Sequence, residues 1–210
     1  MSSFVNTLHT KTIIIATQNE KKRAEIREIL KDNPGILLRG PDDFPFLPLV
    51  EEDGTTFQEN AVKKAIILAK ACNTWAMSDD SGLEIDALGG RPGVYSCRYA
   101  GANATDEKNI EKVLSELRGV PRERRTARFI CTTALAGSKG LFFVVEGCCE
   151  GFITEEPKGK YGFGYDPIFY VPDHRQTFAE LNPAIKNRIS HRAHALKQFN
   201  EKLQPLIRQL

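Results

Sequence analysis

Residues 11–30 read "KTIIIATQNEKKRAEIREIL", and this stretch decides the class of fold. It opens with a β-branched run, turns polar at residues 17–19, and then places Ile26, Ile29 and Leu30 on one side of a helix. The pattern therefore predicts a strand, a loop and a helix. Asn19 is of a residue type that caps helices, so the loop would offer free backbone N–H groups, with lysines nearby, to an anion.

The rest of the chain continues in the same way and predicts an α/β fold. A second helix is expected from Thr55, where Thr55 and Gln58 have capping-box spacing, and a third from Thr105. A short buried strand, "TWAM", precedes "SDDSG" at residues 78–82, and two later strands flank the turn "GSKG" as a hairpin. A last helix begins near Ser190. Because no repeat or linker interrupts this order, residues 1–210 are predicted to form a single domain.

The composition of the chain excludes several classes of protein. Its 210 residues can bury one sizeable core, and 41% hydrophobic with 27% charged residues is typical of globular proteins. The longest apolar runs are far shorter than the roughly 20 residues that cross a bilayer, so no membrane partner is expected. A net charge of +2 is too small to indicate a nucleic-acid partner. The first ten residues lack the features of a secretory signal, so a cytoplasmic location is expected.

The five cysteines are odd in number and have no CxxC spacing. In a cytosolic chain this pattern predicts reduced thiols without a metal cluster or a catalytic role. The residues concerned are Cys72, Cys97, Cys131, Cys148 and Cys149.

Four polar clusters are expected in loops beside regular elements: "TQNEKK", "EEDG", "DDSG", and "GFGYDP" with "KNRISHR". Each one has an ordinary interpretation, namely a helix start for the first, surface turns for the next two, and the first turn of a helix for His191 and Arg192. Taken together they indicate more. Carboxylates of Glu52 and Asp80 suit Mg²⁺, lysines suit phosphates, and the planar ring of Phe163 suits a purine. The set describes a magnesium nucleotide site.

Four motifs in register resemble a known family, and they span about Thr12 to Phe199. They are "ATQNEKK", "SDDSGLEIDALGGRPGVYSCRYAG", "GFGYDPIF" and "ISHRAHAL". This order and spacing is similar to that of the inosine triphosphate pyrophosphatase family, in particular its bacterial dITP/XTP pyrophosphatases. The resemblance implies a mixed, elongated central sheet flanked by helices, two lobes with the active-site cleft between them, and a homodimer.

The resemblance also implies roles for individual residues. The triphosphate would be held by Thr17, Gln18, Asn19, Glu20, Lys21 and Lys22. Glu52 and Asp80 would hold Mg²⁺, Asp80 would in addition accept a proton, and Ser81 and Lys64 would lie near the phosphates. The base would be recognised by Phe163, Gly164, Tyr165, Asp166, Lys186, His191 and Arg192.

The implied reaction is hydrolysis of noncanonical purine nucleoside triphosphates (dITP, ITP and XTP) to the monophosphate and pyrophosphate, with water as nucleophile. Two alternatives remain: a pyrophosphatase for another modified nucleotide, and a nucleotide sensor without hydrolytic activity. "FGYD" and "SHR" favour a purine, and the presence of both Glu52 and Asp80 favours hydrolysis.

Overall fold

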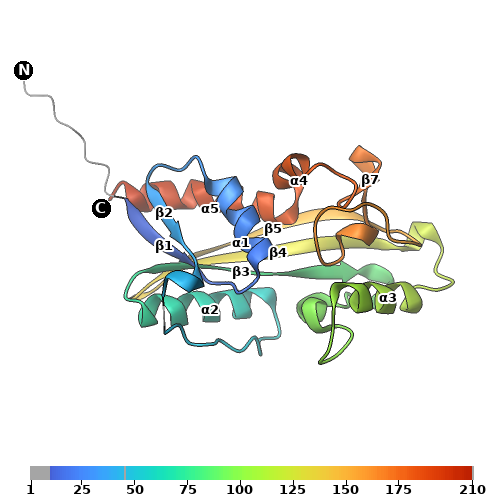
Figure 1. Ribbon diagram of the computed structural model, residues 1–210, viewed down its shortest axis with the longest axis horizontal. Helices are drawn as coiled ribbons and strands as arrows, with labels where there is room; N and C mark the ends of the chain where they lie inside the picture. Colours follow the sequence, from blue (N-terminus) through green and yellow to red (C-terminus); the bar gives the residue numbers. More distant parts are fainter. Residues whose placement is uncertain (1–9, 45, 210) are drawn as a thin grey trace, which may run out of the picture.

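A computed structural model describes residues 10–44 and 46–209; the first nine residues, on which most of the expectation about a secretory signal rests, lie outside them. One seven-stranded sheet runs along the length of the molecule, in the order β2-β1-β3-β4-β5-β6-β7 (Figure 1). Its strands are β1 (Lys11–Ile15), β2 (Ile36–Arg39), β3 (Trp75–Ile85), β4 (Thr126–Gly137), β5 (Gly140–Ile153), β6 (Phe169–Val171) and β7 (Gln176–Thr177). The first three pair in parallel and the others antiparallel, so the predicted mixed sheet is confirmed.

Helices cover both faces of the sheet at its parallel end. The α-helices are α1 (Glu20–Leu30), α2 (Phe57–Ala71), α3 (Asp106–Glu116), α4 (Pro183–Ile189) and α5 (His191–Ile207). Ile26 of α1 and Phe199 of α5 pack with Met77 in one core, whereas Ala61 and Ala65 of α2 pack in another. α3 lies at the far end of the sheet, where a third core forms (Figure 1).

Most of the predicted local structure is confirmed. Asn19 caps α1 by accepting a hydrogen bond from the N–H of Lys22, and Ser190 caps α5 in the same way for Ala193. The hairpin of β4 and β5 turns at the predicted "GSKG". The prediction for α2 was off by one residue, because Thr56 is the cap and the carboxylate of Glu59, rather than Gln58, accepts the N–H and hydroxyl of Thr55. A carboxylate is the stronger acceptor at the positive end of a helix.

The prediction of a short strand "TWAM" followed by a polar loop was wrong. β3 continues through the whole of "SDDSG" to Ile85, and its partner is β4 along this length. β1 pairs with β3 only at Trp75–Met77. Within the described residues, Ser78 to Leu83 therefore have no neighbouring strand on the β1 side, and the edge of β3 is open there.

The helix α4 was also missed, since "KNRI" was expected in a loop. Asn182 caps it and Pro183 occupies its first position, where the missing N–H costs nothing. In the part of the chain that the structure describes, no helix has the length and hydropathy to cross a membrane.

Candidate active site

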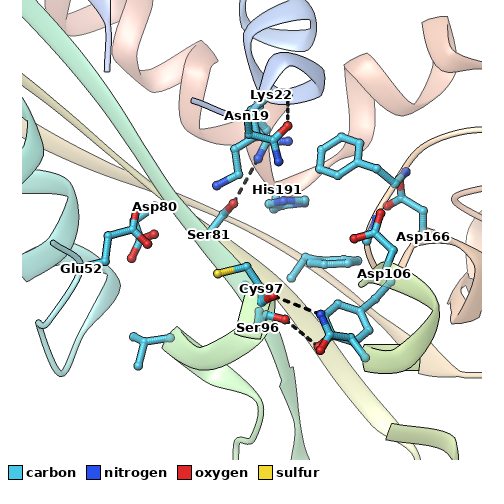
Figure 2. Close-up of a pocket in the computed structure, with 18 of the residues that line it drawn as sticks. Asn19, Lys22, Glu52, Asp80, Ser81, Ser96, Cys97, Asp106, Asp166 and His191 are labelled. Carbon is cyan, nitrogen blue, oxygen red and sulfur yellow. Dashed lines mark hydrogen bonds between the residues drawn. The ribbon is translucent and has the colours of Figure 1, made fainter. Parts of the chain in front are cut away.

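A pocket lies along the open edge of β3 and is lined by residues that are far apart in the sequence, from Asn19 to Arg192. Figure 2 shows Glu52 and Asp80 at one end of it, Asp106 and Asp166 at the other, and Ser81 and His191 between them. Most of the predicted site residues line this pocket: Asn19, Lys22, Glu52, Asp80, Ser81, Phe163, Gly164, Tyr165, Asp166, Lys186, His191 and Arg192.

The adjacent carboxylates Asp79 and Asp80 point to opposite faces, because successive side chains of a strand alternate. Asp79 accepts hydrogen bonds from Arg192 Nε (2.9 Å) and Cys131 Sγ (2.9 Å), and its Oδ1 lies 2.6 Å from Lys22 Nζ. Asp80 faces α2, where Asn60 Nδ2 donates to its Oδ2 at 3.1 Å. One carboxylate therefore ties α1, β4 and α5 together, and the other is presented to the pocket.

The two neighbouring carboxyl groups have opposite pKa shifts. Burial opposes the ionisation of Asp79, but the charges of Arg192 and Lys22 hold its pKa well below the ordinary value. Burial raises the pKa of Asp80, and Lys64 and Lys22 offset only part of this effect. Such a divided pair is typical of sites where one carboxylate is structural and its neighbour takes up a proton.

Lys64 lies between the two carboxylates that were predicted to hold a metal. Its Nζ is 2.6 Å from Glu52 Oε1 and 3.5 Å from Asp80 Oδ1, and it also donates to the carbonyl oxygen of Asp79. Despite partial burial, the pKa of Glu52 is lowered, chiefly by Lys64. The two carboxylates converge on Lys64 and offer only oxygen donors, which suits Mg²⁺.

Only one side of the "TQNEKK" segment faces the pocket. The N-cap residue Asn19 and, three positions later on α1, Lys22 line it, whereas Glu20 points to solvent. Lys21 is largely exposed, and its Nζ lies 3.9 Å from Asp106 and 5.8 Å from the centre of the Phe163 ring. Thr17, Gln18 and Lys64 line a neighbouring hollow with Leu47 and Leu49.

The other end of the pocket is built around the ring of Phe163. Lys186 Nζ lies 4.6 Å from the ring centre and donates to Asp166 Oδ2 (2.5 Å) and Glu25 Oε1 (2.9 Å). Asp166 Oδ2 also accepts the backbone N–H of Phe163 at 2.8 Å. The hydroxyl of Tyr165 donates to the carbonyl of Ser96, which joins this loop to the opposite wall.

His191 and Arg192, the first two residues of α5, are both buried. The ring of His191 stacks on Phe129 (4.7 Å between centres, 12° between planes), and burial lowers its pKa well below the ordinary value, so it is neutral near pH 7. The guanidinium of Arg192 bonds to Asp79, to Glu25 and, through Nη2, to Ser81 (3.1 Å). A buried ion-pair chain therefore runs from Asp79 through Arg192 and Glu25 to Lys186.

Several lining residues were not predicted from sequence, namely Gly82, Val94, Ser96, Cys97, Asp106, Asn109 and Phe129. Asp79 and Glu25 were not predicted from sequence either. These two carboxylates form the ion pairs with Lys22, Arg192 and Lys186. The segment "GVYSC" belongs to one of the family motifs, but none of its side chains is of a type that by itself indicates binding or catalysis. Gly82 allows this segment to approach β3, since a Cβ there would contact Gly93 and Ser96.

Gly162 is expected to be indispensable for the shape of the Phe163 loop. Its φ is +75°, and a Cβ would overlap the carboxylate of Asp166. We expect Gly162→Ala to lower the free energy of unfolding by about 1–3 kcal/mol, measured by urea denaturation. Gly164→Ala is the matched control: its φ of +58° gives a similar backbone strain, but the added Cβ would meet open space, so its loss should be smaller than that of Gly162→Ala. Equal losses in both variants would mean that the contact with Asp166 contributes nothing.

The fold and the pocket define an α/β protein with a site that combines paired carboxylates, cations and an aromatic ring. The model of the Ham1 family matches residues 13–202, and the chain belongs to this family. It is 53% identical over 194 residues to the dITP/XTP pyrophosphatase of Bacillus subtilis, covering 92% of this chain and 98% of that protein. It is 52% identical over 194 residues to the dITP/XTP pyrophosphatase of Shouchella clausii, covering 91% and 96%.

Solved structures agree with this assignment. A HAM1 protein from Coxiella burnetii superposes with a TM-score of 0.85 at 46% identity, over 93% of this chain and all of that one. A nucleoside-triphosphatase / dITP/XTP pyrophosphatase from Mycobacterium abscessus gives a TM-score of 0.73 at 39% identity, over 90% and 97%. The predicted family relationship is confirmed.

Proposed function

We propose that this chain is a nucleoside triphosphate pyrophosphatase that hydrolyses dITP, ITP and XTP to the monophosphate and pyrophosphate. One observation carries the proposal: a single pocket has the carboxylates of Glu52 and Asp80 at one end and the Phe163 ring with Asp166 at the other. A nucleotide has the same polarity, with its phosphates at one end and its base at the other. The names of the relatives from Bacillus subtilis and Shouchella clausii support the same reaction.

Glu52 and Asp80 are proposed to hold Mg²⁺. Two convergent carboxylates leave room for the waters and substrate phosphates that normally complete the shell of this ion. When bound, the ion neutralises charge on the pyrophosphate leaving group. Lys64, which lies between both carboxylates, would then turn to the phosphates.

In the proposed mechanism Asp80 accepts the proton of the attacking water. Its carboxylate lines the pocket, and burial raises its pKa above the ordinary value. Lys22 and Lys64, with Lys21 at the mouth, stabilise the negative charge that moves to the leaving group. The proposed phosphate-side set also includes the hydroxyl of Ser81 on β3. At the start of α1 it is completed by side-chain and backbone N–H groups of Thr17, Gln18, Asn19 and Glu20.

The base end is proposed to select purines that carry an oxygen at position 6. Lys186 donates two of its three N–H groups, to Glu25 and Asp166, and one remains. Arg192 donates four of its five N–H groups, to Asp79, Glu25 and Ser81, and one N–H on Nη1 remains. These remaining donors fit the 6-oxygen of hypoxanthine or xanthine. The amino group of adenine would leave them unpaired, and such sites discriminate by up to roughly 10⁴-fold.

The proposal is tested by pyrophosphate release from dITP, XTP, dATP and dTTP, each with Mg²⁺ and after exhaustive chelation. We expect rapid release from dITP and XTP, little from the other two, and almost none without divalent cation. Faster release from dTTP than from dITP and XTP would favour a base pocket for pyrimidines, and tight binding without release would favour a sensor. Full activity after chelation would contradict the metal role of Glu52 and Asp80.

A homodimer in the cytoplasm is proposed as the functional form, on the basis of the family resemblance. Sedimentation equilibrium at micromolar concentration is expected to give about 47 kDa, twice the 23.5 kDa of one chain. A monomer would contradict the dimer and leave the proposed reaction unaffected.

A further inference from the structure

Two carboxylates hold consecutive backbone N–H groups beside the Phe163 ring. Asp166 Oδ2 accepts the N–H of Phe163 at 2.8 Å, and Asp106 Oδ2 accepts the N–H of Gly164 at 2.8 Å. Asp166 belongs to the same loop. Asp106, by contrast, is the first residue of α3, and it precedes Gly164 by 58 positions in the chain. α3 is therefore joined directly to the loop that carries the aromatic ring.

A helix start alone does not account for this contact. A carboxylate in the first turn of α3 is favourable because of the positive end of the helix, and Glu107 in the same turn has this advantage as well. Asp106 differs from Glu107 because it also lines the pocket and bonds to Gly164 (Figure 2). The backbone of Gly164 has a φ of +58°, which glycine adopts without steric strain, and Asp106 is the partner that accepts its N–H.

The ion pair with Lys21 is the weaker of the contacts that Asp106 makes. The two charged atoms are 3.9 Å apart, and both side chains are about half exposed or more, so solvent screens their attraction. A hydrogen bond from a backbone N–H to a carboxylate is directional and stronger. The position of the loop therefore depends on the hydrogen bond that Asp106 accepts from Gly164 more than on its ion pair with Lys21.

We propose that Asp106 is a positioning residue, which fixes the Phe163 ring for stacking on the base of the nucleotide. The inference rests on the proposed function, because it takes Phe163 as the surface on which the base stacks. Loss of Asp106 would leave the phosphate end of the pocket intact and let the ring move at the base end. The effect belongs to binding of the base rather than to the chemical step, so KM should change more than kcat.

The experiment compares four variants with the wild-type chain: Asp106→Ala, Asp106→Asn, Glu107→Ala and Phe163→Ala. In Asp106→Ala we expect KM for dITP to rise about tenfold with kcat changed less than about threefold, the scale of one lost hydrogen bond to a charged group. Inhibition by inorganic tripolyphosphate, which has no base, should be unchanged. Hydrogen–deuterium exchange at residues 163–164 should become faster.

The asparagine variant and the glutamate variant separate the possible causes. Asp106→Asn keeps an acceptor oxygen but loses the charge that strengthens the bond, so its KM and exchange rate should lie between those of wild type and Asp106→Ala. An effect equal to that of alanine would mean that the charge opposite Lys21 is what matters, and it would overturn the inference. Glu107→Ala removes an equivalent charge from the same helix turn near Lys21, so it should change neither KM nor exchange. An unchanged KM and exchange rate in Asp106→Ala would also overturn it.

The same measurements distinguish this inference from the proposed function. A wild-type chain that releases no pyrophosphate from any purine triphosphate overturns the function, and the stacking role with it. A KM unaffected by Phe163→Ala removes the stacking surface while hydrolysis stands. If wild-type turnover is normal and Phe163→Ala raises KM, but Asp106→Ala changes neither KM nor the exchange rate, only the positioning role of Asp106 is contradicted.

Discussion

Replacing Asp80 by asparagine is expected to lower kcat for dITP by about 100-fold or more, because the amide can neither accept the proton of water nor bind a cation with full charge. The shape of the site should survive, since the remaining carbonyl oxygen can still accept the hydrogen bond that Asn60 donates. Binding of dITP, measured by calorimetry in the presence of Ca²⁺, should therefore change far less than turnover.

The control for this variant is Asp53→Asn. Asp53 is the neighbour of Glu52 in the chain, but its side chain is exposed and pairs with Lys63 at the surface. Its replacement should leave kcat unchanged. Retention of more than about a tenth of wild-type turnover in Asp80→Asn would remove Asp80 from the role of proton acceptor, given the 10²-fold or larger effect of losing a general base.

The second large effect is expected on stability, from Asp79→Ala. This change leaves the guanidinium of Arg192 buried without its main partner and removes the anion beside Lys22. Breaking a buried ion pair by removing one partner typically costs about 3–5 kcal/mol of unfolding free energy. The expected result is a loss of this size in urea denaturation at pH 7.

A matched exposed pair and the pH dependence provide the controls. Asp86 lies 2.9 Å from Arg128, the same separation as between Asp79 and Arg192, but both partners are partly exposed, so Asp86→Ala should cost at most about 1 kcal/mol. Because the pKa of Asp79 is lowered by folding, its contribution is complete above the ordinary value of about 3.9 and is lost as pH falls below it. The difference between wild type and Asp79→Ala should therefore shrink below about pH 4. Equal losses at Asp79 and Asp86 would contradict the role of burial.

The same ion-pair chain changes how Arg192 can be tested. The sequence placed Arg192 in the base-reading set, where truncation to alanine would alter the ratio of kcat/KM for dITP and dATP. Its side chain is completely buried between Asp79 and Glu25, so alanine would also leave two carboxylates without their cation. A loss of stability is therefore expected together with any loss of selectivity, and the ratio is interpretable only in variants that remain folded.

The elements of this fold were largely predictable because their signals are local. The spacing of Phe57, Ala61 and Ala65 marks one face of α2, and all three are buried. Asn19 and Ser190 mark helix starts through bonds to residues three positions later. The errors arose where tertiary pairing decides the outcome. "SDDSG" has the composition of a turn, but ten consecutive residues of β3 pair with β4, and this ladder overrides the local preference.

The sequence by itself determined the order of the longer elements, the family, and the set of groups that could bind a metal, phosphates and a base, since these follow from residue types and spacing within short motifs. Only the tertiary structure decided what each group contacts. Asp79 is the buried partner of Arg192, 113 positions later in the chain, whereas its neighbour Asp80 lies in the pocket. In the same way, Asp106 bonds to Gly164, which follows it by 58 positions. Such contacts leave no periodic signal in the chain, because they are set by how the helices pack on the sheet and by where β1 ends and leaves the edge of β3 open.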